Sequence, residues 1–558
     1  MRPARHLGAQ LGRPILFVVV AEDDVRAALA GDLEARFGGD CRIVAEGGPA
    51  EAVESLERLA AASEDVAIVI AGMELPGTTG IELLASAHYF HPMARRVLLV
   101  ERDFTPRNPI VQAMTLGQID YHLPRPWFPE RGLYPTVTEI LADWAASRGS
   151  AFEMFRVVGP RWDPRSHELR EALTRMSIPY GFYPADTEEG RALLADVGAD
   201  EAQGPVLVRY DGYALVDPSM PELGAANGAK VHPDAASCDV AILGGGPAGL
   251  TAAVYAASEG LATLLLEREL PGGQAGTSSR IRNYPGFPYG MRGPDLGYRA
   301  CEQAWLFGAD MVYAQPATGL SARGSERLVR SADGSEISSR AVIVATGMAW
   351  RRLGVPALED LVGAGVFYGA AGGEAQAMSG LSVFVVGAGN SAGQAARYLA
   401  QSGASVTMLV RGRSLAVSMS DYLVRELQET PTISVRLRTE IVGGRGDGRL
   451  EAITVRDNSS GDTETLPAAG LFVMIGGEPR TGWLGDAVAR NPGGFILTGR
   501  DIPGDAWPLA RPPLHLETSL PGVFAAGDVR HRSVKRVASA VGEGAMAVES
   551  VHEYLAEI

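Results

Sequence analysis

The stretch Asp239-Val-Ala-Ile-Leu-Gly-Gly-Gly-Pro-Ala-Gly249 decides how the second half of this chain folds. Its first five residues are typical of a buried strand, and the sequence after it is typical of a helix. Gly244 permits a tight turn, Gly246 lets the backbone approach a pyrophosphate, and Gly249 lets the helix pack closely on the strand. The helix N-terminus offers free N–H groups and a positive dipole end to phosphate. The pattern therefore predicts a strand–turn–helix unit that binds a dinucleotide.

The next strand, residues 262–267, supports this prediction because it ends in an acid, Glu267. A carboxylate at that place can accept hydrogen bonds from ribose hydroxyls. A glycine pattern alone is weak evidence, and a glycine-rich turn without a ligand is the alternative. Strand, helix and carboxylate occur together here, which favours the nucleotide site.

A second strand–glycine–helix pattern begins at Leu381 and continues through Gly387-Ala-Gly389-Asn-Ser-Ala392. The strand after its helix ends at Val410 rather than at an acid, and Arg411 and Arg413 follow. Arginines pair well with a 2′-phosphate, which a carboxylate would repel. The second site therefore favours NADPH over NADH. The alternative is that the two arginines belong to an ordinary solvated loop.

Five more strings occur in a fixed order around these motifs: Gly272-Gly-Gln274, Asn283-Tyr-Pro-Gly286, Ala345-Thr-Gly347, Gly522-Val-Phe-Ala-Ala-Gly-Asp528 and Lys535-Arg-Val-Ala-Ser-Ala540. With the two glycine motifs, this ordered set resembles the thioredoxin reductase family of flavoproteins over residues 238–558. The resemblance implies FAD and NADPH as cofactors and a homodimer. It also implies an FAD domain in two pieces, 238–350 and 478–558, with an NADPH domain, 351–477, inserted between them.

The resemblance also implies roles for particular residues. Gly246, Gly249 and Glu267 are expected to hold the adenosine side of FAD, Gln274 and Asn283 to lie near the flavin, and Asp528 to bind the ribityl chain. A helix that begins at Val537 is expected to point at the flavin pyrimidine, where its dipole stabilises negative charge. The candidate cofactor-binding residues are Gly244, Gly246, Pro247, Ala248, Gly249, Glu267, Gly273, Gln274, Asn283, Thr346, Gly347, Gly387, Gly389, Asn390, Ser391, Ala392, Arg411, Arg413, Gly527, Asp528, Val537 and Ala538.

One feature of the family is missing. The family carries a CxxC just before the second glycine motif, but the matching stretch, residues 366–375, contains no cysteine. We therefore expect hydride to pass from NADPH to the flavin and then to an unidentified acceptor, a protein being one candidate. The cofactor carries this chemistry, so no catalytic side chain is required. The alternatives are a flavin-based redox-sensing signalling protein and a disulfide reductase that uses other cysteines, such as Cys301.

Residues 13–145 alternate short apolar strands with helices, a doubly wound α/β pattern. They resemble a response-regulator receiver, with Glu22 and Asp23 as its acidic pair. Gly72 stands where the acceptor aspartate is expected, Val100 replaces the switch hydroxyl, and Arg125 replaces the lysine. Since no acyl phosphate can form on Gly72, we expect a pseudo-receiver that serves as a docking surface. The alternative is that the two acids are ordinary solvated residues.

Residues 153–225 faintly resemble a thioredoxin or glutaredoxin fold without redox cysteines. Trp162–Ser166 takes the place of the redox loop, and Ser166 is expected to be a helix N-cap. A hairpin is expected around Asp211-Gly212. Residues 218–237 are rich in Pro, Gly and Ala and are expected to be a linker. The whole chain is thus expected to be α/β, with two Rossmann-like domains after the two front domains.

Composition limits the partners and the location. The net charge is −16, which disfavours nucleic acid and anionic membrane as partners. The three cysteines, Cys41, Cys238 and Cys301, are far apart, which fits the cytoplasm and excludes a cysteine-based zinc site. The histidines form no metal pattern, so no metal is expected. The apolar run that starts at Ile15 is expected to be a buried strand rather than a signal peptide, and Glu543 and Glu549 are expected on a helix surface.

Overall fold

The computed structural model describes residues 13–101, 118–147, 153–200, 204–278, 281, 283–287, 290–369 and 375–557. The chain divides into two compact units, Met1–Phe152 and Glu153–Ile558. None of the helices within the described ranges is long and apolar enough to cross a membrane.

The first unit is built on a five-stranded sheet of order β2-β1-β3-β6-β7, in which every pair of neighbours is parallel. The strands β1 and β3 are buried along their whole length, as strands covered on both faces should be. The α/β alternation expected for residues 13–145 is therefore present, and the run that starts at Ile15 is a strand. The elements are β1 Ile15–Val19, α1 Asp23–Phe37, β2 Arg42–Glu46, α2 Pro49–Ala61, β3 Val66–Gly72, β4 Glu74–Leu75, β5 Thr78–Thr79, α3 Gly80–Phe90, β6 Arg95–Glu101, β7 Tyr121–Arg125 and α5 Tyr134–Ser147.

The second unit opens with a four-stranded sheet of order β11-β10-β8-β9. The expected hairpin is present, since β10 and β11 pair antiparallel on either side of Asp211-Gly212. The expected linker is wrong in part: its start folds into helix α8, which has a capping box between Ser219 and Glu222 and buries Leu223 against this sheet. We call β8 to α8 the small sheet domain. Its elements are β8 Phe155–Gly159, α6 Pro164–Arg175, β9 Tyr180–Pro184, α7 Glu188–Val197, β10 Val206–Arg209, β11 Ala214–Val216 and α8 Met220–Ala226.

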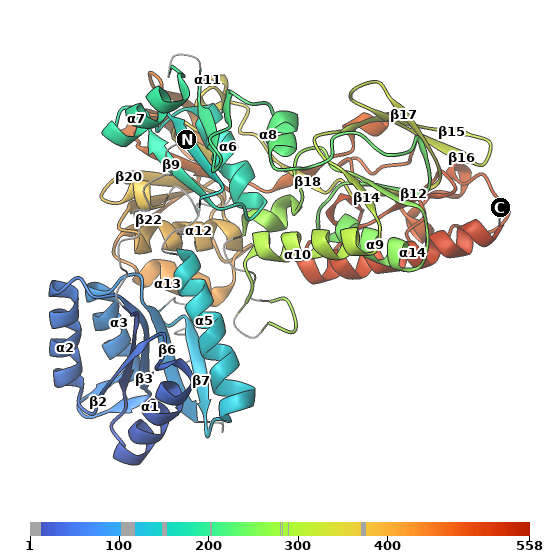
Figure 1. The fold of residues 1–558 in the computed structure, drawn as a ribbon. Helices are drawn as coiled ribbons and strands as arrows, with labels where there is room; N and C mark the ends of the chain where they lie inside the picture. Colours follow the sequence, from blue (N-terminus) through green and yellow to red (C-terminus); the bar gives the residue numbers. More distant parts are fainter. Residues whose placement is uncertain are drawn as a thin grey trace. The chain divides into compact units, whose positions relative to one another are not determined.

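A seven-stranded sheet follows, with the path β14-β13-β12-β17-β16-β15 and with β28 paired to β17. Its last strand comes from nearly 180 residues later in the chain than β17, so two distant segments complete one sheet. Helix α9 contacts both α10 and α14 beside this sheet (Figure 1). The elements are β12 Ser237–Leu243, α9 Pro247–Ser258, β13 Thr263–Leu266, α10 Gly293–Leu306, β14 Asp310–Val312, β15 Ala317–Arg323, β16 Glu326–Ser331, β17 Glu336–Val344, β28 Val523–Ala525 and α14 Val537–Glu557.

Between β17 and β28 the chain forms a five-stranded parallel sheet of order β19-β26-β20-β21-β22 and a three-stranded antiparallel sheet, β23-β24-β25. The short pair β18 and β27 stands at the two ends of this insertion and pairs antiparallel. The elements are β18 Met348–Trp350, α11 Pro356–Glu359, β19 Val366–Tyr368, β20 Ser382–Val386, α12 Asn390–Gln401, β21 Ser405–Val410, α13 Asp421–Glu429, β22 Ile433–Leu437, β23 Thr439–Arg445, β24 Ala452–Asp457, β25 Thr463–Pro467, β26 Gly470–Val473 and β27 Gly477–Pro479.

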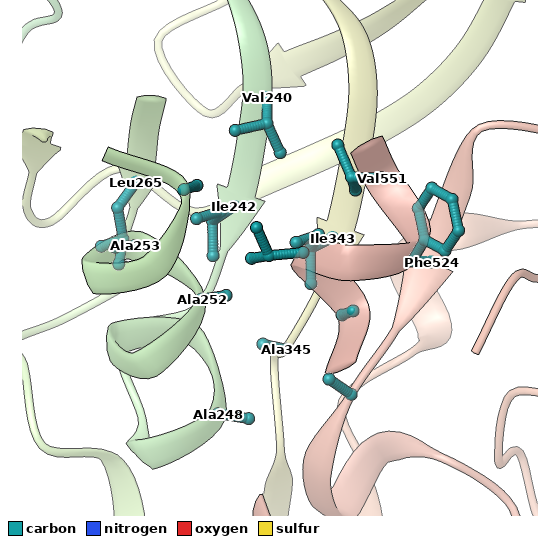
Figure 2. Packing of buried hydrophobic residues seen from close by; sticks show 14 of the residues in the cluster. Val240, Ile242, Ala248, Ala252, Ala253, Leu265, Ile343, Ala345, Phe524 and Val551 are labelled. Atoms are coloured by element: carbon teal, nitrogen blue, oxygen red, sulfur yellow. The ribbon is translucent and has the colours of Figure 1, made fainter. Parts of the chain in front are cut away.

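The core behind the first glycine motif joins three parts of the chain (Figure 2). Ala252 and Ala253 of α9 belong to this core, and Ile242 of β12, Ile343 of β17 and Phe524 of β28 form a row across the three neighbouring strands. Small residues on α9 let this helix lie close to the strands, because a larger side chain would hold helix and sheet apart. This packing fixes where the N-terminus of α9 lies.

Candidate functional site

The first glycine motif forms the predicted turn between β12 and α9. Gly244 has a φ of +111°, and a Cβ atom there would stand 2.5 Å from the Ala345 carbonyl oxygen. A Cβ atom on Gly249 would stand 1.8 Å from the Gly244 carbonyl oxygen. On Gly246, by contrast, a Cβ atom would meet only the Gly273 Cα, at 3.9 Å. Two glycines are thus required by packing, and the third leaves open space in front of the turn.

The N-terminus of α9 is suited to an anion. Gly246 is its N-cap and Pro247 its first residue, and no side chain caps the helix. The first N–H groups of a helix have no partner within it, and the helix dipole adds partial positive charge there. Ala248 is buried behind the turn. An uncapped helix end of this kind can bind an anion such as a pyrophosphate.

Glu267 lies immediately after β13 and turns its carboxylate toward the glycine motif. It accepts hydrogen bonds from the backbone N–H groups of Gly245 and of Glu269, the latter at 2.9 Å. Only 6% of the residue is exposed. Burial raises the pKa of Glu267, and the two N–H donors oppose that rise. The carboxylate is therefore beside the turn where a ribose is expected, and its oxygens are held by the backbone.

The segment at Gly273 and Gln274 is tied to the same turn. The Gly272 N–H donates to the Gly245 carbonyl oxygen at 2.8 Å, and the Gln274 side chain donates to the Met348 carbonyl oxygen at 3.0 Å. The expectation for Asn283 is less well supported, because this residue is exposed. Among the described residues no hydrogen bond joins Asn283 to the glycine turn.

The end of β17 approaches from the other side. The Ala345 N–H donates to the Leu243 carbonyl oxygen at 2.8 Å, so Thr346 and Gly347 leave the sheet next to Gly244. The Thr346 hydroxyl donates to the Arg480 carbonyl oxygen at 2.9 Å. Gly347 has a φ of +62°, in the region that favours glycine. These bonds tie the start of the insertion to its end.

The C-terminal segment completes this group. A Cβ atom on Gly527 would stand 3.0 Å from the Ala248 Cβ, so Gly527 lies against the start of α9. Asp528 is next to it and half-buried; burial raises the pKa of its carboxyl, and Lys535 opposes the rise. Helix α14 begins at Val537, as predicted, with Val537 and Ala538 half-buried. Distant segments thus converge on the N-terminus of α9.

Glu543 was expected on the surface of α14, and this expectation is wrong. Its side chain is buried, with 7% exposed, and forms an ion pair with Arg530 at 2.6 Å. It also accepts the Gly527 N–H at 2.7 Å. The signal was present in the sequence: Glu543 follows Ala540 by three residues and precedes Ala547 by four, so all three share the buried helix face. Glu549 is exposed, as expected.

The second glycine motif forms an equivalent turn between β20 and α12. Gly387 has a φ of +143°, and its Cβ atom would stand 2.5 Å from the Met474 carbonyl oxygen. Gly389 is the helix N-cap, without a side-chain cap, and has open space where its Cβ would be. Asn390 accepts from the Ser420 N–H at 2.8 Å, which ties it to the next loop. Ala392 is buried and Ser391 is exposed.

Arg411 and Arg413 are exposed directly after β21. The parallel strands β20 and β21 end at the same edge of their sheet, so the arginines follow the strand that neighbours the glycine turn. Two guanidinium groups in that loop can pair with a phosphate on the ribose of a nucleotide.

The cysteines do not form a pair. Val366–Gly369 of the stretch that matches the CxxC is described, and residues 370–374 lie outside the described residues. Burial raises the pKa of Cys238 and of Cys301 to about 12. Cys41 belongs to the other unit, and burial raises its pKa as well. All three thiols are therefore protonated near neutral pH, which makes them poor nucleophiles.

In the first unit the residues of the receiver-like pattern form an ion-paired group. Arg125 pairs with Glu22 at 3.0 Å and also with Glu101. Glu22 is thus ion-paired although it is exposed, and among the described residues Asp23 pairs with Arg26 of its own helix. Gly72, at the end of β3, brings no carboxylate to the strand ends. Within the described residues no group of three or more His, Cys, Asp or Glu side chains could hold a metal.

In the small sheet domain, Ser166 is not the N-cap of α6. Asp163 is the N-cap: its carboxylate accepts the Ser166 N–H at 2.7 Å and the Ser166 hydroxyl at 2.9 Å. Asp163-Pro164 is itself a sequence signal for a helix start, with the acid as cap and proline as the first helical residue. Trp162 packs against the core of the parallel sheet β19-β26-β20-β21-β22.

Comparison with known proteins agrees with this geometry. Residues 238–544 match the family model described as pyridine nucleotide-disulphide oxidoreductase. The chain is 33% identical over 321 residues to the thioredoxin reductase of Bacillus subtilis (strain 168), a match that covers 57% of this chain and 95% of that protein. It is 33% identical over 320 residues to a bifunctional thioredoxin reductase/thioredoxin of Mycobacterium leprae (strain TN), covering 57% of this chain and 66% of that protein.

A solved structure shares the fold. The Lactococcus lactis thioredoxin reductase (FR conformation) is 29% identical, with a TM-score of 0.51, and the match covers 57% of this chain and 100% of that chain. Matches of this extent over both glycine motifs show the family. The chain therefore belongs to the pyridine nucleotide-disulphide oxidoreductases of thioredoxin reductase type and is an FAD-dependent NADPH oxidoreductase.

Proposed function

We propose that this protein passes electrons from NADPH through FAD directly to an external acceptor, without a cysteine pair of its own. The observation that carries the proposal is the absence of cysteine from residues 366–375, where the family has its CxxC. Bound FAD supplies the two-electron redox chemistry that such a transfer needs. The acceptor is a small molecule or a protein that reaches the flavin itself.

The proposed FAD site uses the residues that converge on α9. Gly244, Gly246 and Gly249 shape the turn, and the uncapped helix end receives the pyrophosphate with Pro247 and Ala248 behind it. Glu267 accepts the ribose hydroxyls. The fit is supported by the open space at Gly246 and by the carboxylate that the backbone already orients.

On the flavin side, Asp528 receives the ribityl chain, and the N-terminus of α14 at Val537 stabilises negative charge at the pyrimidine. Lys535, just before that helix, donates to the Asp528 carbonyl oxygen and lies 4.5 Å above the Phe495 ring. This cation adds to the positive potential at the helix start. Gln274 and Thr346 form the opposite wall of the proposed flavin site. Their side chains donate hydrogen bonds to backbone carbonyl oxygens around the β18–β27 pair.

The proposed NADPH site is the second glycine turn, from Gly387 to Ala392, with Arg411 and Arg413 on the 2′-phosphate. We assign residues 238–350 and 478–558 to the FAD domain and 351–477 to the NADPH domain. The sheets support this division, because β28 completes the seven-stranded sheet after the insertion has ended. We also propose that 13–145 is a pseudo-receiver and 153–225 a thioredoxin-like domain, and that the protein is a cytoplasmic homodimer.

The alternative in which Cys301 serves a disulfide reductase has little support. Cys301 is buried on α10, and a pKa of about 12 leaves almost no thiolate at neutral pH. The redox-sensing alternative keeps the same FAD site but does not require that NADPH reduces the flavin. It differs in making flavin reduction a signal rather than a turnover step.

The test is an anaerobic stopped-flow mix of the purified flavoprotein with NADPH, and separately with NADH, followed at about 450 nm. We expect rapid loss of flavin absorbance with NADPH and slower loss with NADH. The reduced protein is then mixed with a small one-electron acceptor and with a disulfide substrate. Reoxidation by the first but not the second supports the proposal. Reduction of the disulfide at a catalytic rate contradicts it, and a flavin that neither nucleotide bleaches leaves the sensing alternative.

A further inference from the structure

Arg175 links the small sheet domain to the segment that follows β13. It is the last residue of α6, and it precedes the region that matches the family, residues 238–544. Its guanidinium donates to the Glu269 carboxylate at 2.8 Å and to the Leu270 carbonyl oxygen at 3.4 Å. Only 16% of the Arg175 side chain is exposed. This is a largely buried, charge-assisted contact between residues 94 positions apart.

Glu269 connects this contact to Glu267, whose carboxylate is proposed to bind the ribose of FAD. Its backbone N–H donates to the Glu267 carboxylate at 2.9 Å, and Glu267 in turn accepts from the Gly245 N–H in the glycine turn. Two further arginines, Arg268 at 3.5 Å and Arg480 at 3.6 Å, pair with the Glu269 carboxylate more loosely. Although burial alone would raise the pKa of Glu269, Arg175 holds it below its usual value. Glu269 is thus an ionised group with three arginine partners, of which Arg175 is the closest.

The backbone around Arg175 also packs against the loop that follows Glu269, next to the proposed FAD site. Cβ atoms built on Gly272 and Gly276 would lie 3.6 Å and 3.5 Å from the Arg175 carbonyl oxygen. Leu270 is buried in the core of the small sheet domain. Ser177, two residues further on, donates to Asp295 of α10 at 2.7 Å. The contact is therefore a packed interface with the loop that carries Gly273 and Gln274.

One donor of the guanidinium is not used. The Arg175 Nε is buried and has no hydrogen-bond partner within the described residues. Buried donors without a partner are uncommon, and a bound group can satisfy them. This donor belongs to Arg175, the residue that connects the small sheet domain to Glu267 through Glu269.

We propose that Arg175, a residue of the small sheet domain, is a positioning residue for FAD. It acts through Glu269. This inference rests on the FAD site proposed above. Arg175 fixes Glu269, and Glu269 fixes Glu267 and the start of the 272–274 turn. The small sheet domain, which has no redox cysteine, thereby acts as a structural part of the FAD site. FAD retention depends on it.

The experiment measures FAD affinity in the full-length protein. FAD is removed, and the apo-protein is titrated with FAD while the quenching of flavin fluorescence is followed. Arg175→Met leaves Glu269 without its closest cation, so we expect FAD to bind roughly tenfold more weakly than to the unchanged protein. Arg156→Met is the matched control: Arg156 lies in the same domain and pairs with Glu153 at 3.0 Å on the surface. Its FAD affinity is expected to stay within about twofold.

A double-mutant cycle separates positioning from general loosening of the fold. If Arg175 acts through Glu269, then Glu269→Gln and Arg175→Met together weaken FAD binding no more than the stronger single change. Additive effects overturn this route. Equal FAD affinity in Arg175→Met and the unchanged protein overturns the proposal as a whole. Arg175→Lys keeps the charge without the planar fork, and we expect roughly threefold weaker binding.

Two further outcomes are decisive. If Arg175→Met does not fold, Arg175→Lys decides: unchanged FAD affinity in that variant would mean that Arg175 serves folding alone. The failure of this inference is also distinct from the failure of the proposed function. An unchanged protein that binds no FAD contradicts the proposed function, whereas variants that bind FAD equally well contradict only the role of Arg175.

Discussion

At the scale of single residues, the glycine turn makes the most direct prediction. Gly249→Ala places a Cβ atom 1.8 Å from the Gly244 carbonyl oxygen, so the turn or the helix must shift. Overpacking of this kind costs about 1–3 kcal/mol, and here the shift occurs at the pyrophosphate site. We expect the purified variant to lose most of its FAD and to unfold at lower urea concentration. FAD content per chain and urea unfolding are the measurements.

Gly542→Ala is the matched control, because Gly542 lies within α14 and has open space where its Cβ would be. Alanine in a helix interior is better than glycine by about 0.5–1 kcal/mol, so this variant should be slightly more stable and keep its FAD. A Gly249→Ala protein that retains full FAD would show that the turn does not hold the cofactor.

Single residues also show how far sequence patterns reach. Gly244, Gly249 and Glu267 were predictable because strand, turn and helix are adjacent in sequence and their spacing is set by backbone geometry. Arg175 was not, since its contact with Glu269 joins residues that only the folded chain brings together. Nor was the ion pair of Arg125 with Glu22, for the same reason.

At the scale of elements, α14 holds the C-terminal part of the proposed FAD site in place. Glu543→Gln can still accept the Gly527 N–H but leaves the largely buried Arg530 without its carboxylate. Breaking a buried ion pair in this way costs about 3–5 kcal/mol. We expect lower stability in urea and weaker FAD binding, because Gly527 and Asp528 lie directly beside the pair.

Glu549→Gln is the control on the same helix, since Glu549 is exposed and its replacement should change stability by less than about 0.5 kcal/mol. Similar stability of the two variants would show that the Glu543 pair does not hold the helix. A loss of stability with unchanged FAD affinity would confine Glu543 to folding.

Elements also show why two expectations failed. Residues 218–237 looked like a linker because Pro, Gly and Ala dominate, yet Ser219-Met-Pro-Glu222 carries a capping box and Leu223 supplies the apolar anchor of a short helix. In this segment local capping chemistry outweighs composition. For Glu543 the place on the helix face outweighs the residue type. Both errors came from average properties where specific positions mattered.

At the scale of the whole molecule, the chain has two units with separate hydrophobic cores. Both carry the α/β alternation that the apolar runs predicted, because buried parallel strands need continuous apolar sequence. The sequence also predicted two nucleotide turns in one unit. It could not show that the small sheet domain packs on the FAD side, since no local pattern encodes an interface between distant segments.

This division predicts separate unfolding of the two units. We expect calorimetry to show two transitions. FAD at 100 times its Kd should raise the midpoint temperature of only one of them, because it adds about 2.7 kcal/mol to the free energy of unfolding of the unit that binds it at 25 °C. Leu56 is fully buried in the core of the first unit, so Leu56→Ala should lower only the transition that FAD leaves unchanged, by about 2–5 kcal/mol. If the fold is instead one cooperative body, a single transition will move with both FAD and Leu56→Ala. Because the small sheet domain belongs to the FAD-binding unit, Arg175→Met should reduce the FAD-dependent rise and leave the first unit's transition where it was.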